Sequence, residues 1–351
     1  MTFEKKILAE MPKCYALGMF EGEDASSFLA AVEKDGPIRR FTLDGEPLET
    51  VAPGPGGVMT ITQVPGRKDQ FLATRKFFSP NFGGDDAAIA SYTKQADGSW
   101  SEQILCDLPY VHRFGILKAA DGQLWVLACS IKGGAETGVK DDWRTPGAVW
   151  AAPLSDNLEQ YTADNQLKLT CVANYQVQNH GFWTAADKSY ALISTAAGVF
   201  RYVPPTTPQG AWDVTCLLVQ PTSDIVATDF DGDGKLEILT FSKFHGDTLA
   251  IWHEGQTRDR YEQVWCDPQK RSFLHALWAA DLNGEKCAVI GNRKDGRDLL
   301  LVRYVDGEYT VDVIDHDLGP ANCMVYRHGG SDYIVAAYRE TDQLALYKVV
   351  E

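Results

Sequence analysis

The sequence predicts an all-β protein, a seven-bladed β-propeller whose ring is closed by the N-terminal strand. Two observations support this fold class. A unit of two alternating strands joined by a turn recurs seven times along the 351 residues, at intervals typical of propeller blades. In addition, the first segment of the chain supplies a strand that the last repeat lacks. We therefore expect residues 1–351 to form a single propeller domain.

Each repeat begins with an aliphatic and aromatic strand, continues through a turn with Asp, Asn or Gly, and enters a second strand. The seven copies span residues 15–34, 57–76, 112–132, 180–195, 223–243, 275–294 and 321–340. A third strand follows, such as TLAIWHE or LLLVRYV. A fourth strand then has a recurring form, as in WSEQILCDLP and YEQVWCDPQ. Four strands in each repeat are the blade arrangement of a propeller.

The seventh repeat ends at LALYKVVE without a fourth strand. Near the N-terminus, the segment FEKKILAEMP has the same pattern as WSEQILCDLP and can complete the last blade. Closure of this kind removes the exposed sheet edges that an open array of blades would carry. The ring is therefore expected to close with the two ends of the chain in one blade.

Two repeats carry long insertions after their second strands, at residues 77–86 and 131–147. Both contain Gly, Pro and aromatic residues, which suits surface loops that fold over a site. They are either lids or tolerated surface insertions, and the pattern does not separate these interpretations.

The composition is strongly acidic, with 48 acidic and 33 basic side chains and a net charge of -15. This disfavours nucleic-acid binding, which needs a basic surface. No apolar run of about 18 residues predicts a membrane span. The N-terminus shows no signal-peptide pattern, so we expect a cytoplasmic protein, although a trimmed signal would be invisible.

Eight cysteines are spread singly along the chain, without CxxC pairs, which is typical of reduced and buried thiols. Four of them recur at similar places in successive repeats and are expected in the core: Cys106, Cys171, Cys216 and Cys266.

The fifth repeat contains an acidic turn, Asp229-Phe-Asp231-Gly-Asp233-Gly-Lys235-Leu-Glu237. Acidic side chains at alternate positions, with glycines between them, form a loop of oxygen ligands that can wrap a calcium ion. We expect the four acidic side chains and the carbonyl of Lys235 to bind a structural Ca²⁺ in the fifth blade. The flanking runs alternate as strands do, so the loop is the turn of a hairpin, unlike an EF-hand.

This turn resembles the FG-GAP or VCBS type of β-propeller repeat, whose usual form is D-x-D-G-D-G-x-x-E. Among enzymes with this architecture, the chain looks most similar to the propeller of aldos-2-ulose dehydratases. It is more loosely similar to propeller-fold polysaccharide lyases. Both resemblances imply elimination chemistry on a carbohydrate, with histidines and a divalent metal at the mouth of the central channel.

Three histidines, His112, His180 and His275, stand at the start of the first strand in their repeats. Asp224 and Asn322 occupy similar places in the fifth and seventh repeats. First strands line the channel of a propeller, so these positions converge at its mouth, on the face opposite the acidic turn. A ring of histidines suits proton transfer or a second divalent metal. Alternatively, each imidazole hydrogen-bonds its own turn.

A series of cations lies on the same face, because six of the seven second strands end in Lys or Arg. They are Lys34, Arg75, Lys76, Lys132, Lys243, Arg293, Lys294 and Arg339. Such a group would attract anions, and arginine would bind a carboxylate with two hydrogen bonds. These cations can also be ordinary solvated charges at strand ends. His245 follows in a loop of the fifth repeat.

The residues expected to bind a substrate at this face are Lys76, Lys132, Lys243, Arg293, Arg339, Asn322 and Trp183. Aromatic residues nearby, Tyr15 and Trp183 among them, either offer flat faces to a sugar ring or pack the blades.

The chain contains no GxSxG elbow, P-loop, strand-linked GxGxxG or HExxH motif. Elimination needs a base for a proton next to a carbonyl and positive charge for the developing enolate. Histidines and cations on one face supply both. The sequence therefore favours a lyase or dehydratase acting on a small ketosugar, glycoside or uronate-type substrate. His112, His180, His275 and His245 would act as acid/base groups or metal ligands.

Two alternatives remain open. The first is a non-catalytic propeller module, stabilised by calcium, that binds carbohydrate or protein. The second is a sugar isomerase or epimerase, which would use the same residues. No nucleic-acid or membrane partner is expected, and the oligomeric state is left open.

Overall fold

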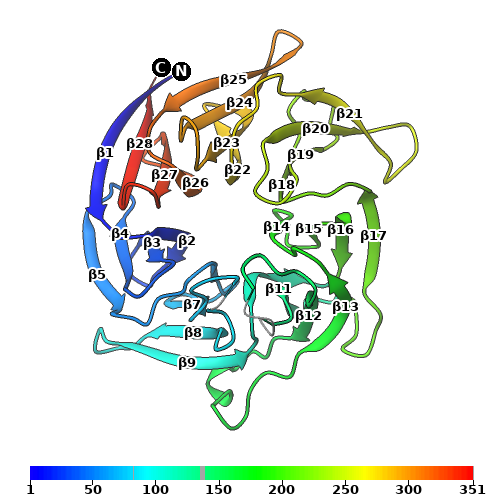
Figure 1. The fold of residues 1–351 in the computed structure, drawn as a ribbon. Coiled ribbons are helices and arrows are strands. Elements are labelled where there is room, and N and C mark those ends of the chain that lie inside the picture. Colours follow the sequence, from blue (N-terminus) through cyan, green and yellow to red (C-terminus); the bar gives the residue numbers. More distant parts are fainter. Residues whose placement is uncertain (82, 135–138, 351) are drawn as a thin grey trace.

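The computed structural model, which describes residues 1–81, 83–134 and 139–350, has the predicted seven-bladed propeller fold. Seven four-stranded sheets stand in a ring around a central axis (Figure 1). Within these residues the one short helix is η1 (Leu158–Gln160), a 3₁₀ turn. No helix in the described ranges has both the length and the apolarity needed to cross a membrane.

The first three blades follow one another along the chain. Blade 1 contains β2 (Cys14–Glu21), β3 (Ser26–Val32), β4 (Ile38–Thr42) and β5 (Pro47–Ala52). Blade 2 contains β6 (Ile61–Gln63), β7 (Gln70–Arg75), β8 (Ala88–Lys94) and β9 (Trp100–Asp107). Blade 3 contains β10 (Val111–Lys118), β11 (Leu124–Lys132), β12 (Pro146–Pro153) and β13 (Thr170–Gln176).

The remaining blades complete the ring. Blade 4 contains β14 (Gly181–Thr184), β15 (Ala191–Thr195), β16 (Gly198–Val203) and β17 (Asp213–Leu218). Blade 5 contains β18 (Asp224–Thr228), β19 (Glu237–Ser242), β20 (Thr248–Glu254) and β21 (Tyr261–Cys266). Blade 6 contains β22 (Leu274–Leu282), β23 (Glu285–Asn292), β24 (Leu299–Val305) and β25 (Glu308–Asp315). Blade 7 contains β26 (Pro320–His328), β27 (Ser331–Tyr338), β28 (Gln343–Val350) and β1 (Thr2–Glu10).

Burial falls from the inner strands of each blade to the outer strand. The second strands β11 and β23 are almost entirely buried, because they have strands on both sides and neighbouring blades on both faces. The outermost strand β21 has no buried residue. The second strands are accordingly rich in Val, Ile, Leu and Ala, as strands covered on both faces are.

The hydrophobic core lies between adjacent blades. Phe28 and Phe41 of blade 1, for example, pack in one cluster with Met324 and Val335 of blade 7. Burial of each such side chain contributes about 1.5–3 kcal/mol of stability. Each blade is therefore held mainly by its neighbours, and the ring forms one continuous core.

The N-terminal strand closes the ring as the sequence predicts. Strand β1 pairs antiparallel with β28, from Thr2 opposite Val350 to Glu10 opposite Gln343, so the two ends of the chain lie side by side (Figure 1). Salt bridges then join β1 to the blades on either side. Lys5 Nζ lies 2.7 Å from Asp315 Oδ2 of blade 6, and Lys6 Nζ lies 2.6 Å from Glu46 Oε1 of blade 1.

All eight cysteines are free thiols. The expected core position is right for Cys106, which is buried, but wrong for the three equivalent residues. Cys171 and Cys266 are exposed, and Cys216 is half-buried. All four cysteines lie on outer strands, which largely face solvent. Cys106 is buried because it packs in the core cluster that contains Leu154 and Leu167 of the following repeat.

Candidate active site

Four histidines converge at one end of the central channel, as the repeat positions predict. His112 and His275 are the second residues of β10 and β22, and His180 directly precedes β14. His245 comes from the turn between β19 and β20. The innermost strands surround the axis in Figure 1, which explains why positions distant in sequence meet there.

The imidazole rings form a continuous group. The centroid of the His180 ring lies 4.6 Å from that of His112, 5.1 Å from that of His245 and 5.4 Å from that of His275. The centroids of His245 and His275 are 5.3 Å apart. Gly181 permits the close packing of blades 4 and 5 here, since a Cβ atom on it would lie 2.8 Å from Asp224 Cα of blade 5.

Backbone carbonyls orient two of the rings. His180 Nδ1 donates to Ser223 O at 3.1 Å, and His275 Nδ1 donates to Ala321 O at 2.7 Å. A carbonyl oxygen only accepts, so each of these imidazoles is protonated on Nδ1 and has its lone pair on Nε2. A hydrogen bond from one ring nitrogen to a backbone carbonyl is the usual way in which a histidine is oriented to bind a metal through its other ring nitrogen.

Three ring nitrogens in the cluster are buried and have no hydrogen-bond partner among the described residues: His112 Nδ1, His180 Nε2 and His245 Nε2. One ring nitrogen from each of His180, His245 and His275 lies within 4.8 Å of the others. Buried nitrogens left without partners cost free energy. A divalent ion bound by His180, His245 and His275 would satisfy two of these nitrogens, those of His180 and His245, so these residues fit a metal.

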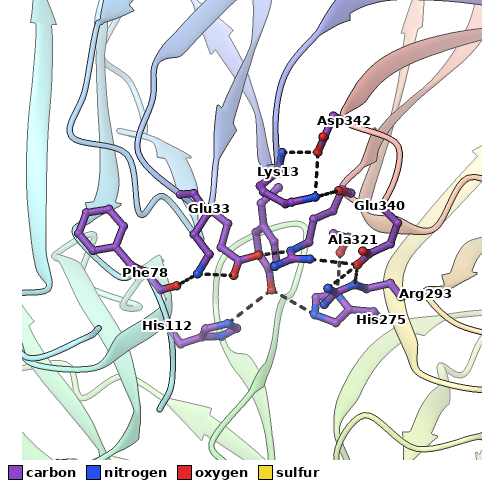
Figure 2. Close-up of polar contacts among 12 residues, drawn as sticks. Lys13, Glu33, Phe78, His112, His275, Arg293, Ala321, Glu340 and Asp342 are labelled. Carbon is purple, nitrogen blue, oxygen red and sulfur yellow. Dashed lines mark hydrogen bonds and ion pairs between the residues drawn. The ribbon is translucent and has the colours of Figure 1, made fainter. Parts of the chain in front are cut away.

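The tyrosine of the first blade joins the histidines. Tyr15 Oη lies 3.3 Å from His275 Nε2 and 3.5 Å from His112 Nε2 (Figure 2). Because His275 Nε2 carries a lone pair, the Tyr15 hydroxyl donates to it. His112 Nε2 must then donate to the tyrosine oxygen, which leaves the lone pair of His112 on Nδ1. From the sequence, Tyr15 is expected only as one of several aromatic residues near this face.

Arg113 is a second group of the site that sequence analysis did not select. Its Nη1 donates to Met59 O at 2.6 Å, and its Nη2 reaches Tyr15 Oη at 3.5 Å. In the described part of the chain, no carboxylate forms an ion pair with it. The only signal in the sequence was its position directly after His112. The guanidinium therefore places an uncompensated positive charge beside the tyrosine oxygen.

The environment keeps the histidines neutral. Burial lowers the pKa of His112 well below its ordinary value, and His180 and Arg113 lower it further. Burial likewise lowers the pKa of His275, with Arg293 adding to the effect, and lowers that of His245. Burial and then Arg113 lower the pKa of His180 to about 3. Neutral imidazoles can accept a proton or bind a metal ion.

The pKa values of Tyr15 and Asp224 shift upward, in the direction opposite to those of the histidines. Burial raises the pKa of Tyr15, which Arg113 opposes, so the phenol stays protonated and able to donate. Burial also raises the pKa of Asp224 to about 7. Its Oδ2 lies 3.7 Å from His180 Nδ1, which agrees with the place that the repeats predict for it.

The cations expected around the channel mouth are mostly paired. Arg293 Nη2 lies 2.6 Å from Glu340 Oε1, and Arg339 bonds Glu33 and Glu340 (Figure 2). Lys34 Nζ lies 3.3 Å from Glu33 Oε1. The attraction expected for anions is therefore reduced at this part of the rim, because Glu33 and Glu340 balance the two arginines.

The other expected substrate-binding residues are dispersed. Lys132 is buried and donates to Asp142 O at 2.7 Å, so it anchors the 131–147 insertion. Lys76 is half-buried and Lys243 is exposed at the same rim. Asn322 accepts from the amide of Cys323 at 3.2 Å. Trp183 packs against Tyr190, toward the other end of blade 4, and is not brought to the histidines.

Aromatic side chains cover the histidines. Phe244 and Phe273 stack on His245, with centroids 3.9 and 4.3 Å away. Phe77 packs on His112, and Trp143 packs on Phe244. Phe77 and Trp143 belong to the two insertions, of which residues 82 and 135–138 lie outside the described ranges. The insertions therefore contribute to the cover of the cluster.

The acidic turn lies at the opposite end of blade 5, between β18 and β19, as expected. Both carboxylate oxygens of Asp229 accept backbone amides, those of Gly232 and Gly234, at 2.8 and 3.1 Å. Asp231, Asp233 and Glu237 converge instead with His253, a residue that sequence analysis missed. His253 comes from β20, and only strand pairing brings it to this turn.

Comparisons with known proteins bear on the fold. No family model matches the chain, and no curated protein matches it. A solved structure described as streptogramin B lyase is similar, with a TM-score of 0.60 and 14% sequence identity over 98% of this chain and 97% of that chain. At this identity the likeness supports the propeller fold alone. The FG-GAP/VCBS and dehydratase resemblances stay unconfirmed.

Proposed function

We propose that the protein is a metal-dependent lyase that eliminates water or an alcohol from a small carbohydrate bearing a carbonyl or carboxylate group. The observation that carries this proposal is the Tyr15 hydroxyl, held between His112 and His275 beside the three-imidazole group. The similar propeller structure is named as a lyase, and this name is consistent with the reaction class proposed here. The carbohydrate substrate rests on the resemblance to the aldos-2-ulose dehydratases.

In this proposal, His112 Nδ1 takes the proton from the carbon next to the carbonyl. The electron pair of that C–H bond forms the C=C bond, and the bond from the next carbon to oxygen breaks. Tyr15 donates its proton to the departing oxygen. His112 Nε2 then returns a proton to the tyrosine oxygen across their 3.5 Å contact, so Tyr15 regains its proton. His112 is left neutral with its proton on Nδ1, and proton exchange with water after product release restores the Nε2–H tautomer.

Positive charge assists two steps of this sequence. Arg113 Nη2, 3.5 Å from Tyr15 Oη, stabilises the transient phenolate. His180, His245 and His275 would hold a divalent ion, and three imidazoles suit a transition metal more than Ca²⁺ or Mg²⁺. When bound, such an ion polarises the substrate carbonyl as a Lewis acid. If His275 gives its Nε2 to the ion, the Tyr15 hydroxyl is released to the substrate.

The substrate in this proposal is small. Tyr15, His112 and His275 are each 3% exposed, and aromatic residues cover the cluster. A short ketosugar or a monosaccharide uronate needs less displacement of this cover than a polysaccharide chain does. The cover also excludes water, which strengthens the electrostatic interactions inside the site.

The Tyr15→Phe substitution tests the proposal. The zinc-loaded protein is incubated with a panel of small ketosugars and uronate glycosides, and products are followed by ultraviolet absorbance and mass spectrometry. Removal of the hydroxyl should lower kcat by about 10²–10⁴-fold with little change in KM, because it removes an acid that acts only in the transition state.

Tyr333→Phe is the matched control, because Tyr333 packs on Tyr326 in blade 7, outside the site. It should keep wild-type kcat. Undiminished turnover in Tyr15→Phe would refute the proposed acid. A product with the mass of the substrate would indicate an isomerase or epimerase, and saturable binding without any product would indicate a binding module.

A further inference from the structure

The acidic turn of blade 5 contains a second group of convergent side chains, far from the channel mouth along the blade. One donor atom from each of Asp231, Asp233, Glu237 and His253 lies within 4.8 Å of the others. His253 Nε2 is 3.1 Å from Asp233 Oδ2 and 3.4 Å from Glu237 Oε1. Three carboxylates and one imidazole therefore face a common point.

Glu237 shows that this group is more than a set of surface acids. Its side chain is 0% exposed, and its Oε2 accepts the amide of Phe230 at 2.6 Å. Its other oxygen, Oε1, is buried and has no hydrogen-bond partner among the described residues. A buried carboxylate oxygen without a partner is costly, and a bound cation would compensate it. The orphaned atom is the one that faces His253.

Backbone amides fix the rest of the turn. Asp229 accepts the amides of Gly232 and Gly234, while Asp231 Oδ1 and Asp233 Oδ1 accept those of Asp233 and Lys235. Gly232 and Gly234 have φ values of 77° and 88°, which the tight turn requires. The turn is thus held in shape by both oxygens of Asp229 and by one oxygen each of Asp231 and Asp233, and the second oxygen of Asp233 faces His253 Nε2 at 3.1 Å.

We propose that Asp231, Asp233, Glu237 and His253 form a four-ligand site for zinc or a neighbouring first-row divalent ion. Calcium takes about six to eight oxygen ligands and does not favour an imidazole nitrogen. Zinc binds four ligands drawn from His and Asp or Glu. His253 therefore shifts the selectivity of a turn whose sequence predicts calcium. The inference is independent of the chemistry proposed at the channel mouth.

In this proposal, the ion stabilises blade 5 by joining parts of three of its elements. Asp231 and Asp233 belong to the β18–β19 turn, Glu237 begins β19, and His253 lies in β20. One ion would therefore join the turn to the third strand of the blade, which lies beyond β19 in the strand order and reaches the turn through the contact of His253 with Asp233. Its proposed role is structural.

The test compares zinc chloride and calcium chloride added to chelator-stripped full-length protein. Calorimetry measures the affinities of the two ions. Anomalous diffraction at the zinc edge measures the zinc occupancy of the blade 5 turn and of the histidine cluster separately. In wild type, zinc should occupy the turn in preference to an equal concentration of calcium. His253→Gln should weaken zinc binding at the turn by about tenfold or more and leave calcium binding unchanged.

Glu237→Gln is a second variant of the same size, and it should also remove zinc from the turn. His316→Gln is the matched control, since His316 is exposed and pairs with Asp317 outside the group. Calcium occupying the turn in preference to zinc would overturn the proposal. So would zinc density at the turn that is unchanged in His253→Gln, or a turn that takes up neither ion.

Discussion

The Tyr15 hydroxyl has one proton to donate and two imidazoles within reach, so the surrounding side chains decide which of them receives it. The bond from His275 Nδ1 to Ala321 O directs the proton to His275 Nε2. His112 and Arg113 then both donate to the tyrosine oxygen. At this scale, the site depends on donors and acceptors that local sequence does not reveal, because they come from four blades.

Arg113 is expected to act on the reaction through Tyr15. Arg113→Gln removes the positive charge beside the tyrosine oxygen, so the transient phenolate loses a charged hydrogen bond worth about 1.5–3 kcal/mol. Steady-state kinetics should show kcat reduced by about 10–100-fold and KM little changed. Arg303→Gln, which removes an arginine paired with Glu285 and Asp312 on blade 6, serves as the control. An unchanged kcat in Arg113→Gln would exclude this role.

At the scale of elements, charged residues at the ends of second strands join three blades. Glu33 follows β3, Arg293 follows β23, and Arg339 and Glu340 follow β27. Their side chains form a chain of ion pairs from Glu33 through Arg339 and Glu340 to Arg293 (Figure 2). The cations at these strand ends therefore hold blades 1, 6 and 7 together, rather than standing free to attract a substrate.

This chain of ion pairs predicts a pH dependence of stability. Burial raises the pKa of Glu33, but the bond and the charge of Arg339, with the charges of Lys34 and Arg293, together outweigh burial and hold the pKa below the ordinary value of 4.5. The unfolded chain therefore binds a proton before the native state does, and the contribution of Glu33 is present above pH 4.5. It is lost as the pH falls through the lower native pKa.

Glu33→Gln should accordingly lower the free energy of unfolding by about 1–3 kcal/mol at neutral pH, because Arg339 loses one partner. The difference from wild type should shrink as the solution is acidified below pH 4.5. Urea unfolding at several pH values measures both quantities. Glu4→Gln, at an exposed position of β1, is the control and should show neither effect. A constant difference at all pH values would contradict the assignment.

For the whole molecule, closure of the ring depends on one strand. Strand β1 covers the outer edge of β28 and places Lys5 and Lys6 against Asp315 of blade 6 and Glu46 of blade 1. Exposed salt bridges contribute about 0–1 kcal/mol each, so most of the stabilisation comes from strand pairing and from the packing of Leu8 and Ala9.

Removal of residues 1–10 should lower the thermal midpoint and expose an edge that pairs with other chains. Size-exclusion chromatography should then show association that increases with concentration. Addition of a peptide of residues 2–10 should reverse both effects. The double substitution Lys5→Ala and Lys6→Ala tests the salt bridges alone and should change stability by about 2 kcal/mol or less. A truncated protein that stays monomeric with the wild-type midpoint would refute the role of β1.

The sequence by itself determined the seven repeats, the four strands of each blade and closure by the N-terminal segment. Strand alternation and turn residues are local patterns, and each repeat carries them independently. The sequence also placed three histidines at equivalent positions of their repeats. Because equivalent positions in a ring of blades face the same axis, these histidines were expected to lie close together. Only the tertiary structure joined Tyr15 and Arg113 to them, paired Arg339 with Glu33, and brought His253 to the acidic turn. These contacts depend on the angle between blades and the register of paired strands, which couple residues far apart in the chain.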